Sequence, residues 1–136
     1  MPEPSQTEFR LEDLTLMDNE GYGFETICDS AHDNQVLMVP LQVRGRPIAH
    51  DVFEVFMETN RGINQAMLTT ARGKTGSVLW VPARGGNLNG PATGVYAELA
   101  RDLQIAGVSS LRMGYRDEDS FAECVLDTLS WLSFLR

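Results

Sequence analysis

The sequence predicts an α/β protein: an antiparallel, β-rich N-terminal part leading into a βαβα unit with parallel strands. Three observations predict this class. Short runs rich in β-branched and aromatic residues fill the first 82 positions, and the loops between them are too short for parallel crossovers. The run 78–81 is continuously apolar, as is typical of a strand covered on both faces. Helical spacing of apolar residues then begins near residue 95 and returns near residue 121.

The first half reads as six strands separated by turns rich in glycine, asparagine and proline. Pro40 lies inside one of these runs, and proline favours an edge strand or a bulge. Glycine and proline are the strongest turn signals, and they place turns between the runs. The predicted strands are 9–16, 24–28, 36–43, 52–57, 65–71 and 78–81, with turns at 21–23, 44–47, 60–62 and 73–76.

The second half carries clearer boundary signals. Pro91 stands where a first-turn proline would, and Gly107 is a natural residue to follow a helix. Between them, Val95, Leu99, Leu103 and Ala106 recur at helical spacing. The strand 108–113 follows by a right-handed crossover, so we expect it to run parallel to 78–81. Ser120 and Glu123 form a capping box before a last helix that is apolar nearly all round, which predicts burial on more than one side.

Composition narrows the class of protein. A length of 136 residues suits a single domain, 1–136, with a β-rich extension at 1–48 and the α/β segment at 49–136. The net charge of −8 argues against nucleic-acid binding. Two distant cysteines and two histidines predict neither a disulfide framework nor a metal site, and no cofactor motif is complete. Without a secretory signal or a membrane-length apolar run, the expectation is a cytoplasmic protein with no membrane contact.

Two loops carry the candidate site residues. Gly85 and Gly86 follow a strand and precede a helix, where backbone N–H groups can face an anion or an oxyanion. A tight strand–helix connection explains the same glycines, and spacing alone favours that interpretation. Tyr115, Arg116 and Asp117 follow the second parallel strand and would form a polar rim to the same crevice, or a solvated loop with an ion pair.

These residues resemble the N-terminal half of an α/β-hydrolase of the serine-hydrolase or peptidase-like branch. The resemblance rests on the strand 78–82, the glycine loop, the helix 96–107 with its Glu98–Leu103 pattern, and the turn Tyr115–Arg116–Asp117. It implies that Arg84, Gly85 and Gly86 form an oxyanion loop, and that the substrate is a small ester or amide. The family's usual histidine before the oxyanion glycines is absent, and Asp117 replaces a glycine.

The resemblance stops before the catalytic groups. No G-x-S-x-G elbow occurs, and the family's serine, acid and histidine would all lie beyond Arg136, so no catalytic residue is assigned here. The last helix would then expose Trp131, Phe134 and Leu135 unless a missing C-terminal half or a second copy covered them. The alternatives are therefore a non-catalytic assembly protein that oligomerises through this helix, and a truncated product that aggregates.

Overall fold

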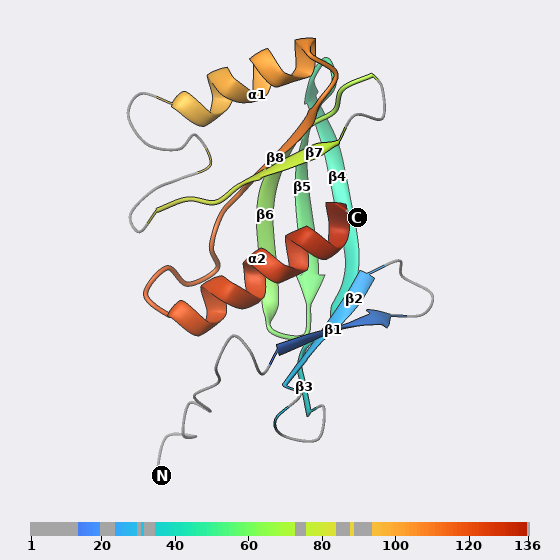
Figure 1. Ribbon diagram of the computed structural model, residues 1–136, viewed down its shortest axis with the longest axis vertical. Coiled ribbons are helices and arrows are strands. Elements are labelled where there is room, and N and C mark those ends of the chain that lie inside the picture. Colours follow the sequence, from blue (N-terminus) through green and yellow to red (C-terminus); the bar gives the residue numbers. More distant parts are fainter. Residues whose placement is uncertain are drawn as a thin grey trace.

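The described residues form two β-sheets and two helices, and the second helix crosses the face of the larger sheet (Figure 1). The described part of the chain contains no helix long and apolar enough to cross a membrane. The computed structural model describes residues 14–19, 24–29, 31, 35–72, 76–83, 88 and 94–135.

The smaller sheet contains the first three strands in the order β1-β2-β3, and both pairs are antiparallel. Residues 9–13 of the first predicted strand, and the turn at 21–23, lie outside the described residues. The register between β2 and β3 shifts between Ile27 and Cys28. The strands are β1 (Leu14–Asn19), β2 (Phe24–Asp29) and β3 (Gln35–Met38).

The larger sheet has five strands in the order β4-β5-β6-β8-β7. Neighbours from β4 to β8 pair antiparallel, and β7 pairs parallel with β8. The sheet is therefore mixed, and the antiparallel pairing predicted for the first half is confirmed. The elements are β4 (Pro40–Ala49), β5 (Val52–Thr59), β6 (Gly62–Thr69), β7 (Ser77–Trp80), α1 (Val95–Ile105), β8 (Ser109–Met113) and α2 (Phe121–Leu135).

Two expectations for residues 36–47 were wrong. The run 36–43 is not one strand: it divides at Val39 into β3 and β4, which belong to different sheets. Residues 44–47 are not a turn but the middle of β4, and the chain turns at His50 and Asp51 instead, where Asp51 has φ 57°. Val39 is held at the crossing point because its N–H donates to Asn60 Oδ1 at 2.8 Å.

Edge pairing explains why glycine and proline at 44–47 lie in a strand. β4 is an edge of its sheet, where a proline without an N–H is tolerated, and its register with β5 shifts between Pro47 and Ala49. Gly45 lies opposite Val55, and a Cβ at position 45 would stand 3.2 Å from Val55 Cγ1. Close packing of the two strands therefore favours glycine there.

The two helices cover opposite faces of the larger sheet. Trp80 and Arg112 are register partners, so they share one face, and the Trp80 ring meets Tyr96 of α1 with centroids 5.0 Å apart. Leu111 points to the other face and packs in the same core cluster as Trp131 of α2. α1 buries Ala100 rather than Leu99, which is 38% exposed, so the predicted apolar stripe is turned partly towards solvent.

α2 is buried on two sides, as its composition predicts. One side carries Trp131 into the main core against the five-stranded sheet, and another carries Leu126 against Ile27 and Met38 of the smaller sheet. The expected exposure of Trp131 was wrong, because the chain itself buries this side chain completely. Phe134 and Leu135 are half-buried against the same cluster.

Candidate functional site

The carboxyl ends of β7 and β8 lie side by side, and the chain leaves them towards opposite faces of the sheet. The connection after β7 leads to α1, whereas the connection after β8 leads to α2. In open α/β sheets, a crevice outside the carboxyl ends of the strands forms where neighbouring connections diverge in this way. This is the place in the fold where a ligand site is expected.

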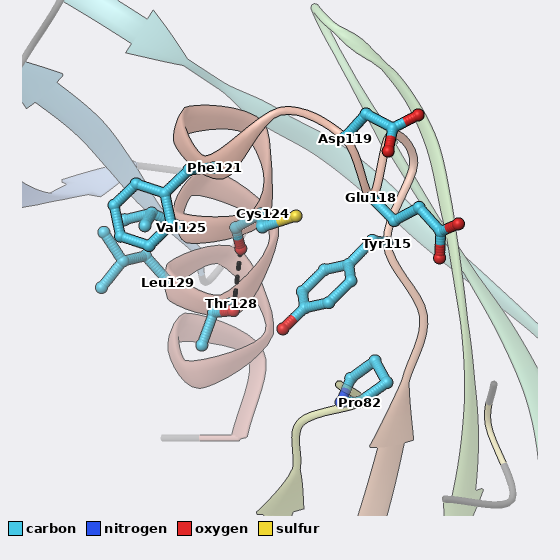
Figure 2. A pocket seen from close by; sticks show the side chains of 9 residues that line it. All are labelled: Pro82, Tyr115, Glu118, Asp119, Phe121, Cys124, Val125, Thr128 and Leu129. Atoms are coloured by element: carbon cyan, nitrogen blue, oxygen red, sulfur yellow. Dashed lines mark hydrogen bonds between the residues drawn. The ribbon is translucent and has the colours of Figure 1, made fainter. Parts of the chain in front are cut away.

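A pocket of about 570 Å³ opens at this point (Figure 2). Pro82 from the connection after β7 and Tyr115 from the end of β8 form one side, and the first two turns of α2 form the other. The α2 residues belong to two neighbouring stripes of the helix surface, since their spacings are three and four. The α2 residues that line the pocket are Phe121, Cys124, Val125, Thr128 and Leu129.

Tyr115 is the polar group that enters the pocket most directly. Its ring lies between Pro82 and α2, with the hydroxyl towards the pocket (Figure 2). Burial raises the pKa of the Tyr115 hydroxyl, and the nearby Cys124 and Asp127 add to the effect. The phenol therefore stays protonated near neutral pH and is available as a hydrogen-bond donor.

Cys124 places a thiol on the α2 side of the pocket, opposite Tyr115. The Sγ–H donates to the Asp117 carbonyl at 3.4 Å. Burial raises the pKa of Cys124, and the negative charges of Asp127 and Asp117 raise it further. Only the thiolate is a strong nucleophile, so this environment makes Cys124 a sluggish one at neutral pH. Thr128 donates its hydroxyl to the Cys124 carbonyl at 2.8 Å, one turn earlier in the helix.

Arg116 turns away from the pocket into a cluster of charges beneath α2. Its Nε donates to Asp127 Oδ1, its backbone N–H donates to Asp127 Oδ2 at 2.9 Å, and its Nη1 donates to the Arg61 carbonyl at 2.8 Å. Glu123 accepts hydrogen bonds from both Arg116 and Arg61. The cluster joins the end of β8, the β5–β6 turn and α2, so its architecture is that of a structural clamp.

The pKa values in this cluster follow from burial and pairing. Hydrogen bonding to Arg61 lowers the pKa of Glu123, and Arg116 lowers it further against the cost of burial. Burial raises the pKa of Asp127, which is fully buried, while the hydrogen bonds from Arg116 act in the opposite direction. For Arg116, burial works to lower the pKa, but Asp127 and Glu123 outweigh it and raise the value. The lowered pKa of Glu123 keeps its carboxylate ionised against Arg61 and Arg116 at neutral pH.

Asp117 closes the cap of α2 rather than pairing with Arg116. Its carboxylate accepts the Asp119 N–H at 3.1 Å, and its carbonyl accepts the Ser120 N–H at 3.3 Å. Half of the predicted capping box forms: Ser120 Oγ accepts the Glu123 N–H at 3.3 Å. The Glu123 carboxylate completes the ion cluster instead of returning to the Ser120 N–H, because two arginines compete for it.

Arg84, Gly85 and Gly86, the candidate oxyanion loop, lie outside the described residues, as does Pro91. Leu88, a described residue of the same connection, contacts two residues of β8 and the segment that follows it. Arg112 Nη1 donates to the Leu88 carbonyl at 3.2 Å, and a Cβ on Gly114 would stand 3.4 Å from Leu88 Cδ2. Leu88 therefore lies beside Gly114, Tyr115 and Arg116 at the end of β8.

No family model, curated protein or solved structure matches this chain.

Within the described ranges, no three His, Cys, Asp or Glu side chains gather as metal ligands would. The polar lining of the pocket is Tyr115, Cys124, Thr128 and the rim carboxylates Glu118 and Asp119, and the Cys124 thiol donates to a backbone carbonyl instead of to a base. Such an arrangement can bind and orient a small molecule, and it needs additional groups for acyl transfer.

Sequence reasoning did not single out the two residues of α2 that matter most here. Asp127 is an acid among the buried residues of an apolar helix, which is a detectable signal for a buried partner. Cys124 lies one helical turn before Thr128, so both had to share a face. Which face met the crevice depended on how α2 docks between the two sheets, and the periodicity of the helix alone does not specify this.

Proposed function

We propose that this chain is an α/β-hydrolase-like protein that hydrolyses an ester or an amide only when further chain or a partner supplies the catalytic triad. One observation carries the proposal: β7 and β8 are parallel neighbours whose following helices lie on opposite faces of the sheet. The resemblance in sequence places an oxyanion loop in the connection after the first of these strands, at Arg84 to Gly86. That connection reaches the crevice that also contains Tyr115.

The open edge of β7 supports the same proposal. Strand–helix–strand connections between parallel strands are right-handed. Because α2 lies on the opposite face from α1, a right-handed connection from β8 through α2 leads back past β7 and not past β6. A strand after α2 would therefore pair with the outer edge of β7, which no described strand occupies. In the α/β-hydrolase family that next strand ends in the nucleophile serine.

The chemistry in such an assembled protein would be acyl transfer to water. The serine oxygen attacks the carbonyl carbon, the histidine takes the serine proton and gives it to the leaving alcohol or amine, and water then releases the acid. Backbone N–H groups of the loop after β7 would stabilise the oxyanion of the tetrahedral intermediate. The present chain would contribute the oxyanion loop and part of the substrate pocket, and the nucleophile would come from elsewhere.

Covalent labelling by a fluorophosphonate probe tests the proposal on the longest native product that contains this sequence. We expect one serine to be labelled, and we expect heat denaturation to abolish the labelling. The matched control is the 136-residue chain alone, which we expect to remain unlabelled because it has no elbow serine. The absence of labelling in the longest native product would contradict the proposal.

The second candidate is a non-catalytic protein that assembles through its C-terminal helix. α2 carries an exposed apolar face of its own, with Phe121 74% and Leu132 40% exposed, although Trp131 is already buried within the chain. This candidate predicts a dimer whose population rises with protein concentration. Light scattering that gives the monomer mass at every concentration would exclude it.

We also propose a reducing, cytoplasmic location, because Cys28 and Cys124 are both free thiols. Alkylation of thiols before cell lysis, followed by mass spectrometry, tests this directly. We expect both cysteines to carry the alkyl group. A disulfide-linked form of either cysteine would contradict the proposal.

A further inference from the structure

The walls and size of the pocket at the ends of β7 and β8 are those of a small-molecule site. Ligand pockets span roughly 300–1,000 Å³ and are mainly apolar with a few placed polar groups. This pocket has about 570 Å³, and Phe121, Val125 and Leu129 line it in one stripe of α2. Figure 2 shows this stripe on the side of α2 away from Tyr115, with Cys124 and Thr128 between them, so a ligand that contacts both Tyr115 and the stripe spans the helix. Phe121 and Val125 pack against neither core cluster. Leu129 also packs against the cluster formed by Ile27, Met38 and Leu126.

Tyr115 gives the pocket a directional polar group. No described residue makes a hydrogen bond with its hydroxyl, although the residue is half-buried. The hydroxyl is open to the pocket (Figure 2), so a ligand that enters can accept its hydrogen bond. Thr128 cannot replace it as a donor, because its proton goes to the Cys124 carbonyl at 2.8 Å. A ligand that carries a hydrogen-bond acceptor therefore fits the pocket.

The negative charge around the pocket affects which apolar ligands can bind there. The chain carries a net charge of −8, and the acidic residues Glu118 and Asp119 stand at the rim of the pocket. A negative potential at the mouth of a low-dielectric cleft repels anions and leaves neutral molecules unaffected. A neutral ligand is thus favoured over a carboxylate or sulfonate of the same shape.

We propose that this pocket binds a neutral, mainly apolar small molecule, with its hydrogen-bond acceptor on the Tyr115 hydroxyl and its apolar part against Phe121, Val125 and Leu129. This binding goes beyond the hydrolase proposal, because it needs no nucleophile and takes place in the present chain alone. Failure of fluorophosphonate labelling would therefore leave it intact, and failure of ligand binding would not remove the labelling result.

The test uses the neutral naphthalene ketone prodan, whose carbonyl is a hydrogen-bond acceptor and whose fluorescence reports a dry environment. We expect saturable binding to one site per chain, with blue-shifted emission. Replacing Tyr115 by phenylalanine should weaken the affinity about three- to ten-fold, the range expected for one neutral hydrogen bond. Val125→Trp should abolish binding by filling the pocket. The matched control, Ile105→Trp on α1, changes a side chain that is 84% exposed and should bind as the wild type does.

Three results would overturn the proposal: no saturable binding of prodan, unchanged affinity in Val125→Trp, or equal affinity for the anionic dye 8-anilinonaphthalene-1-sulfonate. If Val125→Trp does not fold, the wild-type chain decides the matter through Cys124. Saturating prodan should slow alkylation of this pocket thiol by iodoacetamide, and an unchanged rate would overturn the proposal in the same way.

Discussion

Arg116 donates to Asp127 from both its backbone N–H and its guanidinium Nε, so the loop after β8 is tied to the middle of α2. The side chains are 10% and 0% exposed, respectively. The pair holds the loop after β8 against α2, and the pocket lies between α2 and the end of β8. Arg116 therefore acts on the pocket through the helix rather than by contact with a ligand.

Arg116→Ala should lower the free energy of unfolding by about 3–5 kcal/mol, because it leaves the Asp127 carboxylate buried and without its guanidinium. Urea denaturation followed by circular dichroism measures the change. Arg44→Ala is the matched control: Arg44 pairs with Glu58 at 3.1 Å but is 67% exposed, so its loss should cost about 0–1 kcal/mol. Equal losses in the free energy of unfolding for the two variants would contradict the conclusion that Arg116 and Asp127 form a buried clamp.

Glu123→Gln tests the pH dependence of the same cluster. Its folded-state pKa is lowered by Arg61 and Arg116, so its stabilising contribution is complete above the unfolded-state pKa and is lost as pH falls through the folded-state value. At pH 7 the free energy of unfolding of the wild type should exceed that of the variant by about 1–2 kcal/mol. The difference should shrink below about pH 4.3, the ordinary glutamate pKa. A difference that grows on acidification has the wrong sign for this account.

Trp131→Ala tests whether the chain covers its own last helix. Removing a fully buried indole should cost about 3–5 kcal/mol, because a cavity remains between α2 and the sheet. Phe121→Ala, on the same helix but 74% exposed, should change stability by about 0.5 kcal/mol or less. If the costs were reversed, Trp131 would lie on the surface and need a partner after all.

The two cysteines should differ in reactivity. Cys28 is 1% exposed, whereas Cys124 lines the pocket, so iodoacetamide should modify Cys124 first in the native protein. The raised pKa of Cys124 means that its rate should still be rising above about pH 8.5, the ordinary thiol value. Peptide mass spectrometry at several pH values measures both rates. Faster modification of Cys28 would contradict the burial of β2 against α2.

Local patterns predicted most of the elements, since the strands, both helices and the position of Gly107 follow from periodicity and capping. Gly107 has φ 86°, the left-handed value that glycine adopts easily after a helix. Partners distant in the sequence could not be predicted in this way. Pro40 signalled an irregularity, but only tertiary structure shows that the chain passes there from one sheet to the other.

The candidate site was predictable as a place more than as a set of residues. Parallel strands at 78–81 and 108–113 direct attention to their carboxyl ends, and Tyr115 does line the pocket there. Arg116, its neighbour in sequence, points into a buried cluster because Asp127 and Glu123 lie under it. Side chains alternate between faces within a strand, but a loop has no fixed period, so the directions of Tyr115 and Arg116 cannot be assigned from the sequence.

The most direct measurement of the central claim is a two-dimensional NMR titration of the ¹⁵N-labelled chain with prodan. If prodan binds at the crevice, the largest chemical-shift changes should be those of the pocket residues Tyr115, Cys124, Val125 and Thr128. The amide signals of these residues should shift together, and the changes should saturate at one ligand per chain. The amide signals of β5 (Val52–Thr59), which β6 separates from β8, should stay nearly unchanged. Changes that spread evenly over exposed apolar residues such as Ile48 and Ile105, or that never saturate, would contradict the claim.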